Sequence, residues 1–485
     1  MKTTALLFLL LALGSSLSAA QPPNVIFILA DDMGSADLGC CGADPTVLKT
    51  PHCDRLAREG MRFTDASAPA SICTPTRYAA LTGRYCWRTP RKFGTAGDTS
   101  PLMIHPRQLT TASLLKGVGY RTACIGKWHL GIGNPPHSEF TGELAPGPRA
   151  VGFDHFYGIA AGHDDASGVY VENEHVEGLR STTMKPFPRA YYQAYQYLGL
   201  DAPQRVNEDV TPHLTDHVIA WLQQQKSDTP FYLHYTPIVP HVPCTPTKKN
   251  LGASGCGLYG DWILDLDDSV GRILAELDRL QLADNTLIIF TSDNGSVVAA
   301  DSLKGGSQEI HDAWNAGLRS NGGLRSRKHS IFEGGFRVPF LVRWPGKVKA
   351  GSICPEMISL VDVLATFADI IDKPLPPPAR SAEDSHSFLP ALLGETSAAK
   401  PRPAMIEQSH EGVLAIRRGP WKWIEGKPAD PKAISGRASN YMPQLYNLHT
   451  DSAEQTNVLD QNPEVVKELT ALLNQYRTQG YSRRE

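Results

Sequence analysis

Residues 73–77, with the sequence CTPTR, place a cysteine and an arginine where both could take part in catalysis. Pro75 is tolerated in the first turn of a helix, where an N–H has no intrahelical partner, so we predict a helix over 74–81 with Cys73 at its cap. The free N–H groups and helix dipole there suit a tetrahedral anion and are expected to lower the pKa of the thiol. Arg77 lies about one turn further and can reach the same point. The alternative for Cys73 is an ordinary half-cystine.

Two pairs of oxygen-bearing side chains follow continuous apolar runs. The runs are residues 24–30 and 286–290, and the side chains at their ends are Asp31, Asp32, Asp293 and Asn294. Carboxylate and amide oxygens are hard ligands, which favour Ca²⁺ or Mg²⁺ over zinc, and we predict calcium. Turn formation at strand ends is the alternative for either pair alone. The occurrence of two such pairs favours a metal site.

Two further apolar runs also lead to polar side chains. Residues 120–125 are followed by Lys127 and His129, and residues 231–235 by a turn-rich segment that contains His241. Continuous apolar runs are typical of strands covered on both faces of a parallel sheet. Open α/β sheets place ligand sites outside the carboxyl ends of their strands, so these side chains are expected to converge with the acidic pairs.

The elements between these runs indicate an α/β protein with a mainly parallel sheet. Helical patterns occur at residues 50–60, 215–225 and 265–280, so strands and helices alternate. Residues 373–378, KPLPPP, begin a connector rich in helix breakers. We predict a catalytic domain over 23–395 and a smaller domain over 396–485, with short strands at 404–408, 412–417 and 421–425 and a closing helix at 463–479.

The N-terminus and composition indicate an exported protein. Residues 1–20 have a lysine near the start, an apolar run and a Ser-Ala-Ala ending, which predict a cleaved signal peptide and a periplasmic or secreted location. No other stretch approaches the length of a membrane span. The net charge of −3 gives no sign of a nucleic-acid partner. Export permits disulfides among the nine cysteines, and Cys244 with Cys256 is the first pair to test, although free buried thiols are an equal alternative.

Five blocks of this sequence resemble the signature segments of type I sulfatases. Residues 73–77 match C-x-P-x-R and continue into 78–84, YAALTGR. The other blocks are GKWHLG at 126–131, PHVP at 240–243, LRSRK at 324–328 and EGGFRVP at 333–339. The resemblance extends from Asn24 to a segment at 445–448.

This resemblance implies an alkaline-phosphatase-like α/β fold and hydrolysis of a sulfate monoester. In the family, the cysteine that matches Cys73 is oxidised to formylglycine by a formylglycine-generating enzyme. One hydroxyl of the hydrated aldehyde attacks sulfur and the other later expels sulfate. The residues of the motifs imply that the metal is held by Asp31, Asp32, Asp293, Asn294 and residue 73. A sulfated carbohydrate is the expected substrate.

The remaining motif positions imply roles in binding the sulfate and transferring protons. Arg77 would steady the formylglycine, and Lys127 and Lys328 would hold the sulfate group. His129 would accept the proton that releases sulfate, and His241 would protonate the leaving oxygen. The alternatives are a phosphonate monoesterase or phosphodiesterase of the same superfamily, and a non-catalytic sulfoglycan-binding protein.

One segment departs from the family pattern. Where the family usually has glycines around the second lysine, this chain has Ser326 and Arg327 before Lys328 and His329 after it. The added bulk and charge are expected to change the shape of the substrate pocket. Four basic residues could extend it as a groove, but a solvated loop is the favoured interpretation of Arg84, Arg88, Arg91 and Lys92. A polar loop is likewise favoured over substrate contact for His163, Asp164 and Asp165.

Overall fold

The structure is a computed structural model that describes residues 21–188, 196–395, 402–426 and 442–484. The predicted signal peptide at 1–20 and the segment that begins the predicted C-terminal domain lie outside these ranges. Among the described residues, no helix has the length and apolar character needed to cross a membrane.

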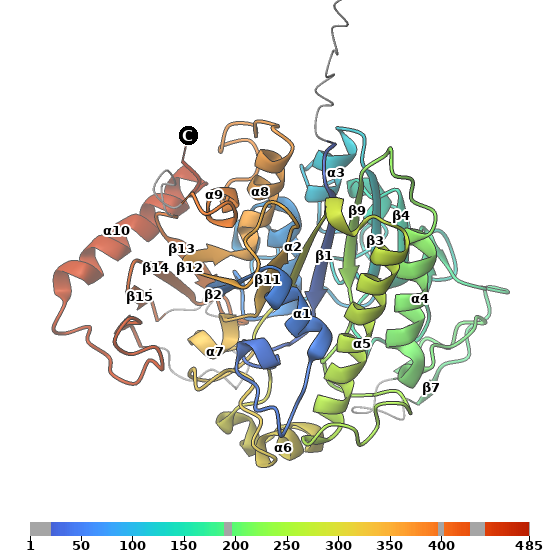
Figure 1. Ribbon diagram of the computed structural model, residues 1–485, viewed down its shortest axis with the longest axis horizontal. Coiled ribbons are helices and arrows are strands. Elements are labelled where there is room, and N and C mark those ends of the chain that lie inside the picture. Colours follow the sequence, from blue (N-terminus) through green and yellow to red (C-terminus); the bar gives the residue numbers. More distant parts are fainter. Residues whose placement is uncertain (1–20, 189–195, 396–401, 427–441, 485) are drawn as a thin grey trace, which may run out of the picture.

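A ten-stranded mixed sheet forms the centre of the molecule (Figure 1). Its strands lie side by side in the order β12 (Ser352–Ser359), β2 (Met61–Ser67), β11 (Phe340–Arg343), β10 (Thr286–Ser292), β1 (Asn24–Ala30), β9 (Phe231–Thr236), β3 (Arg121–Lys127), β4 (His155–Ile159), β5 (Val171–Glu172) and β6 (His175–Val176). The five strands from β10 to β4 are parallel, and every residue of β1 and β10 is buried. The predicted parallel core of the sheet is confirmed.

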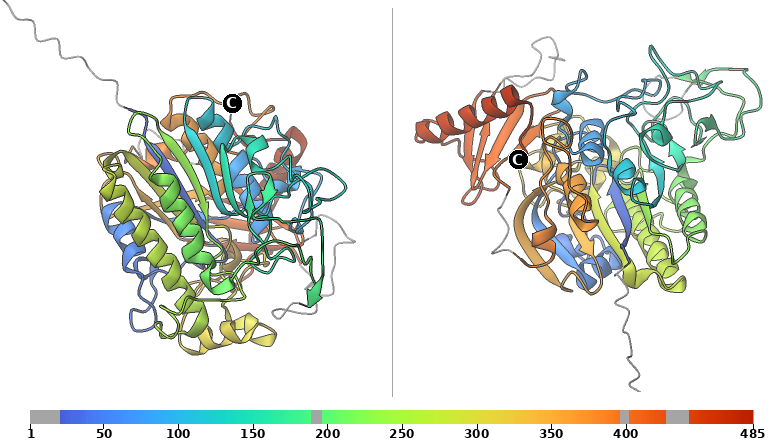
Figure 2. Two further views of the ribbon diagram at one scale, coloured as in Figure 1. Left: turned by 90° about the vertical axis from the view of Figure 1, so that its right-hand side faces the viewer. Right: turned by 90° about the horizontal axis from the view of Figure 1, so that it is seen from above.

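Helices cover both faces of this sheet because alternate side chains of β1 belong to different apolar clusters. Ile26 and Ile28 pack in one cluster with α1 (Pro51–Glu59), α4 (Val210–Leu222), α5 (Gly257–Arg279) and α6 (Gln308–Asn315). Phe27 and Leu29 pack in the other with α2 (Cys73–Thr82), α3 (Thr111–Lys116), α8 (Val363–Ile370) and α9 (Leu389–Leu392). Figures 1 and 2 show α4 and α5 side by side along one face. Successive side chains of a strand point to opposite faces of the sheet, so the apolar run of β1 packs against the helices on both faces.

A second, antiparallel sheet follows near the C-terminus. It contains, in order, β13 (Met405–Gln408), β14 (Leu414–Arg418), β15 (Trp421–Ile424) and β16 (Gln444–Asn447). One face packs on α10 (Pro463–Gln479), where Ile416 and Trp423 join a cluster with Leu469 and Leu473. Figure 2 shows this sheet and helix at one side of the molecule. The smaller antiparallel unit with a closing helix is confirmed.

Several elements differ from the sequence-based predictions. The predicted helix at 265–280 begins earlier, at Gly257, because Tyr259 and Trp262 are buried against the sheet in spite of the local glycines. The predicted helix at 215–225 lies at Val210–Leu222. Strands β2, β11 and β12 were not predicted. The sequence of β2 mixes polar and apolar residues, as expected for a strand near the sheet edge, so it lacks the apolar run of a central strand.

The loop after α2 contains the four basic residues at 84–92, which were predicted to be solvated. That prediction is wrong for two of them, because they form ion pairs with a neighbouring segment. The Arg88 side chain is 4% exposed and binds both carboxylate oxygens of Asp384 at 2.8 Å. Arg84 forms an ion pair with Glu383 at 3.2 Å. These contacts tie the loop to the segment that leads toward the second sheet. All nine cysteines are free thiols in the structure, including the candidate pair Cys244 and Cys256.

Candidate functional site

The four predicted oxygen ligands meet at the ends of β1 and β10. These strands pair in parallel with Ala30 opposite Ser292, so the residues that follow lie next to each other. The Asp32 N–H donates to Asp293 Oδ1 at 3.2 Å, and Asn294 Nδ2 donates to Asp32 Oδ1 at 2.8 Å. Asp31, Asp32, Asp293 and Asn294 are all fully buried. Asp32 has a φ of 66°, in the left-handed region, and the turn there redirects the chain at the sheet edge.

Helix α2 brings Cys73 to this acidic group. The helix begins at Cys73, one residue before the predicted start, and all ten of its residues are buried. The Cys73 Sγ atom lies 3.5 Å from Asp31 Oδ1 and 3.9 Å from Asp32 Oδ1. Strand ends and a helix start, distant in sequence, therefore place a sulfur atom directly against two carboxylates.

The expectation that the helix start lowers the pKa of the Cys73 thiol is wrong. Burial raises this pKa well above its ordinary value, and the nearby carboxylates of Asp293 and Asp31 raise it further. Lys127 and Lys328 act in the opposite direction without reversing the shift. A thiol with a raised pKa carries little thiolate at neutral pH.

Three cationic side chains balance the three carboxylates. Lys127, at the end of β3, places its Nζ atom 2.7 Å from Asp31 Oδ2 and 3.7 Å from Cys73 Sγ. Lys328 Nζ lies 2.8 Å from Asp32 Oδ2. Arg77 Nε donates to Asp293 Oδ2 at 2.9 Å, and the Arg77 Nη2 atom forms an ion pair with the same oxygen at 2.7 Å. With these charges paired, a divalent cation would leave the site net positive, which suits an anionic substrate.

Burial and the paired charges also hold the protonation states of the site. Burial by itself would lower the pKa of Lys127, but the adjacent Asp31 carboxylate raises it above its ordinary value. Burial would likewise raise the pKa of Asp31, but Lys127, His241 and Arg77 hold it well below its ordinary value. Both groups are therefore charged at neutral pH.

Two histidines complete the predicted set. His129 follows β3 with a φ of 56°, and its N–H donates to Ala160 O at 3.0 Å. Burial and Lys127 hold the pKa of His129 well below its ordinary value. His241 Nε2 lies 3.7 Å from Asp32 Oδ2, and burial with Lys328 lowers the pKa of His241. The Nδ1 atom of His241 donates to Val242 O at 2.5 Å, which directs Nε2 toward the acidic group.

These groups open onto one cavity of about 760 Å³. Its lining includes Cys73, Lys127, His129, His241 and Lys328. It also includes side chains for which the sequence gave no catalytic role, among them Asp98, Asp164, Lys304, Arg327, His329 and His410. Asp164 is thus at the cavity, although a polar loop was the favoured interpretation of that segment. His163, by contrast, is buried and bonded to Thr245 at 2.9 Å.

The donor atoms fit a hard divalent cation. Single ligand atoms of Asp31, Asp32, Cys73 and His241 lie within 4.8 Å of one another. Asn294 Oδ1 is buried and accepts no hydrogen bond in the described part of the chain, so it is available as a ligand. Asp293 accepts from the Asp32 N–H through Oδ1 and binds Arg77 through Oδ2. Carboxylate and amide oxygens of this kind are ligands for Ca²⁺ or Mg²⁺.

A hydrogen-bond network behind Asp32 was not predicted from the sequence. The Tyr259 hydroxyl lies 2.9 Å from Asp37 Oδ2, 2.7 Å from Ser296 Oγ and 3.3 Å from the Asp32 carbonyl oxygen. These side chains come from three separate segments and are buried. Only folding brings them together, and no local motif indicated their position behind the acidic group.

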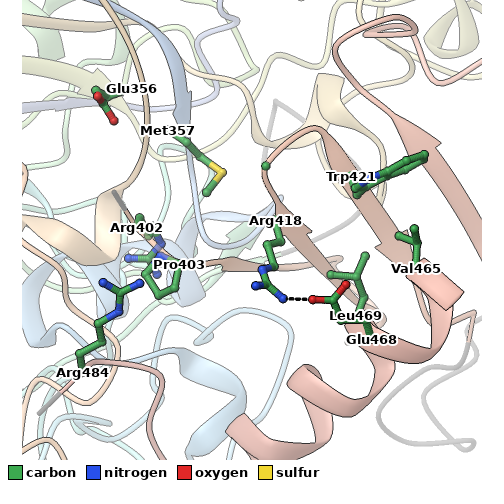
Figure 3. A pocket seen from close by; sticks show the side chains of 11 residues that line it. Glu356, Met357, Arg402, Pro403, Arg418, Trp421, Val465, Glu468, Leu469 and Arg484 are labelled. Atoms are coloured by element: carbon green, nitrogen blue, oxygen red, sulfur yellow. Dashed lines mark hydrogen bonds and ion pairs between the residues drawn. The ribbon is translucent and has the colours of Figure 1, made fainter. Parts of the chain in front are cut away.

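A second cavity, of about 540 Å³, has a different chemical character (Figure 3). It lies between β12, the turn from β14 to β15, and α10. Arg418 pairs with Glu468 there, and Arg402 pairs with Asp362. The described residues that line it include no cysteine, histidine or aspartate. Of these two cavities, only the first is lined by cysteine and histidine side chains.

Comparison with known proteins agrees with this geometry. A family model described as Sulfatase matches residues 23–373. The chain belongs to the sulfatase family. It is an enzyme of the sulfuric ester hydrolase class, and its family implies a formylglycine derived from the cysteine and a divalent metal.

Several relatives of this sulfatase match almost the whole chain. An N-acetylgalactosamine-6-O-sulfatase from Bacteroides thetaiotaomicron is 36% identical, over 95% of this chain and 94% of the relative. Human arylsulfatase A is 32% identical, over 96% of this chain and 89% of its own length. A solved structure from work on glycosaminoglycan metabolism in Bacteroides thetaiotaomicron has a TM-score of 0.85 at 36% identity, and covers 95% of this chain and 100% of the other. The predicted alkaline-phosphatase-like fold is confirmed.

Proposed function

We propose that this sulfatase hydrolyses a sulfate monoester of a carbohydrate, using a formylglycine derived from Cys73 and a bound Ca²⁺ ion. The observation that carries the proposal is the position of Cys73 Sγ, 3.5 Å from Asp31 and 3.7 Å from Lys127, on a cavity that His129 and His241 also line. The relatives named for N-acetylgalactosamine 6-sulfate and the structure from glycosaminoglycan metabolism favour a carbohydrate substrate.

The modified residue and the metal supply the chemistry that the thiol cannot. Oxidation of Cys73 by the maturation enzyme, with an external oxidant as the electron acceptor and loss of the sulfur as sulfide, would give an aldehyde. Its hydrate carries two hydroxyl groups at the position of the present sulfur atom. A divalent cation held by Asp31, Asp32, Asp293 and Asn294 lowers the pKa of such a hydroxyl group and offsets negative charge on the sulfate. Magnesium is the alternative cation, since it accepts the same oxygen ligands.

The basic side chains bind and orient the sulfate group. Lys127 and Lys328 approach the acidic group from different segments, with Nζ atoms 2.7 and 2.8 Å from Asp31 and Asp32. Both can turn an N–H toward a sulfate oxygen while they keep these ion pairs, because an ammonium group has three donors. Arg77 holds Asp293 and donates to the Lys127 carbonyl oxygen at 3.1 Å, so it fixes the end of β3.

His129 and His241 transfer protons in two different steps, the release of sulfate and the departure of the alcohol. His129 has a strongly lowered pKa and is neutral, which suits a group that accepts the proton from a hydroxyl at position 73. His241 would protonate the leaving oxygen through Nε2 in its imidazolium form, since its Nδ1 atom already donates to Val242 O. The nearby Asp32 carboxylate favours that form against the effects of burial and Lys328. A sugar alcohol is a poor leaving group, so this acid contributes roughly 10² to 10⁴ in rate.

Maturation and location follow from the same proposal. Cys73 is 1% exposed, so a formylglycine-generating enzyme must reach it before the chain folds. We propose that the protein is exported to the periplasm or secreted, on the basis of the signal-like residues 1–20.

The proposal is tested with protein co-expressed with a formylglycine-generating enzyme. Mass spectrometry of the peptide that contains residue 73 measures the modification, and turnover is measured on an aryl sulfate, an aryl phosphonate and a panel of sulfated saccharides. Hydrolysis of the aryl sulfate and of at least one saccharide, with the modified residue present, is expected. Faster hydrolysis of the phosphonate would favour the phosphonate monoesterase alternative, and binding of saccharides without turnover by modified protein would favour a non-catalytic role.

A further inference from the structure

Two histidines from different parts of the chain form one wall of the catalytic cavity. His329 follows Lys328, and His410 follows β13 of the second sheet. Both line the cavity that contains Cys73. Their ring centroids are 4.9 Å apart and the ring planes meet at 53°. The second sheet therefore contributes a side chain to the site on the large sheet.

The backbone at His329 is held in a conformation that usually belongs to glycine. Its φ is 79°, and that of Ser326 in the same segment is 62°. A left-handed conformation is unfavourable for a residue with a Cβ atom. The neighbouring backbone holds the segment, since the His329 N–H donates to Ser71 O at 2.7 Å and the Lys328 N–H to Ser296 O at 3.0 Å. Strained conformations of this kind are enriched at active sites and ligand-binding sites.

The position of His410 is fixed by hydrogen bonds to the chain just before the nucleophile. The Gln408 N–H donates to Pro69 O at 3.0 Å, and the Ser71 N–H donates to Gln408 O at 2.9 Å. The His410 N–H then donates to His329 O at 3.2 Å. The two histidines and the start of α2 are thus parts of one hydrogen-bonded unit.

The wall is chemically suited to hydroxyl groups. Burial and the adjacent Lys328 keep the pKa of His329 well below its ordinary value, so its imidazole is neutral. A neutral imidazole has one donor and one acceptor nitrogen, which match a hydroxyl group, whereas a second sulfate would require cationic donors. The cavity of about 760 Å³ leaves room for a sugar residue beside the sulfate group.

We infer that His329 and His410 together bind hydroxyl groups of the sugar that carries the sulfate, and so determine which sulfated sugar this enzyme accepts. This inference rests on the proposed carbohydrate substrate. The two lysines bind the sulfate group, which every substrate shares, whereas the histidine wall contacts the part that differs between substrates.

The test compares His329→Gly and His410→Ala with the unchanged enzyme. Glycine at 329 removes the imidazole and relieves the strained backbone, so this variant is expected to fold with an unchanged or higher Tm. The readout is the ratio of kcat/KM for the best sulfated sugar to kcat/KM for an aryl sulfate without sugar hydroxyls. Each variant is expected to lower this ratio about 10- to 100-fold. His410→Gln, which keeps a donor and an acceptor, is expected to recover part of the loss.

The control is His449→Ala, an exposed histidine of the same C-terminal unit. It is expected to leave the ratio within twofold of that of the unchanged enzyme. A ratio within twofold in both cavity variants, or an equal loss on both substrates, would overturn the inference while leaving the proposed function in place. An unchanged enzyme that hydrolyses aryl sulfate but none of the sulfated sugars would overturn the carbohydrate substrate and this inference with it.

Discussion

Two buried clusters of acidic and basic side chains can be compared in the described part of the chain, and only one of them has the features of an active site. The catalytic cluster joins Asp31, Asp32 and Asp293 to Arg77, Lys127 and Lys328. The second, which we call the joint cluster, lies where the large sheet meets the C-terminal sheet. It is centred on Lys422 and contains Asp65, Glu333, Glu407, Glu454, Arg337, Arg417 and Lys422.

The two clusters differ in what their charges face. In the joint cluster the fully buried Lys422 Nζ lies 2.8 Å from Glu333, 3.1 Å from Glu407 and 3.1 Å from Glu454, so the carboxylates converge on a side chain of the protein itself. In the catalytic cluster the carboxylates converge beside Cys73 and an amide oxygen without a hydrogen bond, at the edge of a cavity. Buried charge alone therefore does not identify an active site. The catalytic cluster is identified because its carboxylates converge at the edge of a cavity that a substrate can enter.

The largest expected effect is a loss of activity when the catalytic cluster is altered at Cys73. Cys73→Ala removes the group that becomes formylglycine, so kcat on an aryl sulfate is expected to fall by roughly 10⁴-fold or more, with little change in Tm. Cys86→Ala, another buried cysteine, is the matched control and should retain turnover. Residual activity of Cys73→Ala above about one per cent would contradict the assignment of catalysis to the cluster around Cys73.

The next largest expected effect is a loss of folding stability when the joint cluster is altered at Lys422. Lys422→Met leaves three buried carboxylates without their common partner, and breaking such a network is expected to lower the free energy of unfolding by about 3 to 5 kcal/mol. Denaturant unfolding measures this loss. Lys467→Met, on the exposed surface of α10, serves as the control and should change the stability by less than about 0.5 kcal/mol. A loss below 1 kcal/mol for Lys422→Met would mean that the joint cluster does not hold the two sheets together.

Metal removal tests the same comparison, because the oxygen ligands of the catalytic cluster lie at a cavity whereas the carboxylates of the joint cluster surround Lys422. A chelator is expected to abolish turnover, and added Ca²⁺ at about 100 times its Kd should restore activity together with about 2.7 kcal/mol of stability. Asp31→Asn weakens the ligand set, so its Tm should respond less to Ca²⁺. Thermal unfolding with and without Ca²⁺, Mg²⁺ or Zn²⁺ measures the effect. A Tm that rises only with Zn²⁺ would contradict the hard-ligand assignment.

The smallest effect, counted per pH unit, is the pH response of the joint cluster. Burial raises the pKa of Glu454 from 4.5 to about 7, with Glu333 adding to the shift against the opposing effect of Lys422. The folded protein therefore binds the proton more tightly than the unfolded chain. The resulting stability is complete below pH 4.5 and is lost as the pH rises toward 7, by at most about 1.4 kcal/mol per pH unit. Glu454→Gln should remove this slope from the unfolding free energy, and an unchanged slope would assign it to other groups.

Local sequence was sufficient to predict the catalytic elements. The apolar runs before Asp31 and Asp293 are buried strands because continuous apolar residues require cover on both faces of a sheet. Pro75 fixed the start of α2 to within one residue, since its ring fits the first turn. Motif residues far apart in sequence could be assigned to one site because parallel strands end at the same edge.

Other features depended on contacts that no local pattern records. The pKa of the Cys73 thiol is raised because burial and carboxylates from other strands outweigh the helix dipole. Arg88 is buried because Asp384, about 300 positions away, accepts its hydrogen bonds. The mixed polarity of β2 concealed a strand whose place was set by its neighbours in the sheet.

The sequence by itself determined the chemistry available to this sulfatase: a modifiable cysteine at a helix start, oxygen ligands after two strands, and lysines and histidines in recognisable blocks. The tertiary structure alone decided which of the buried charges face a cavity and which face each other, and it brought His410 from the second sheet to that cavity. The physical reason is that side-chain types and local periodicity are properties of short segments. Burial, electrostatic shifts and cavity walls arise from contacts between segments, which exist only after the chain has folded.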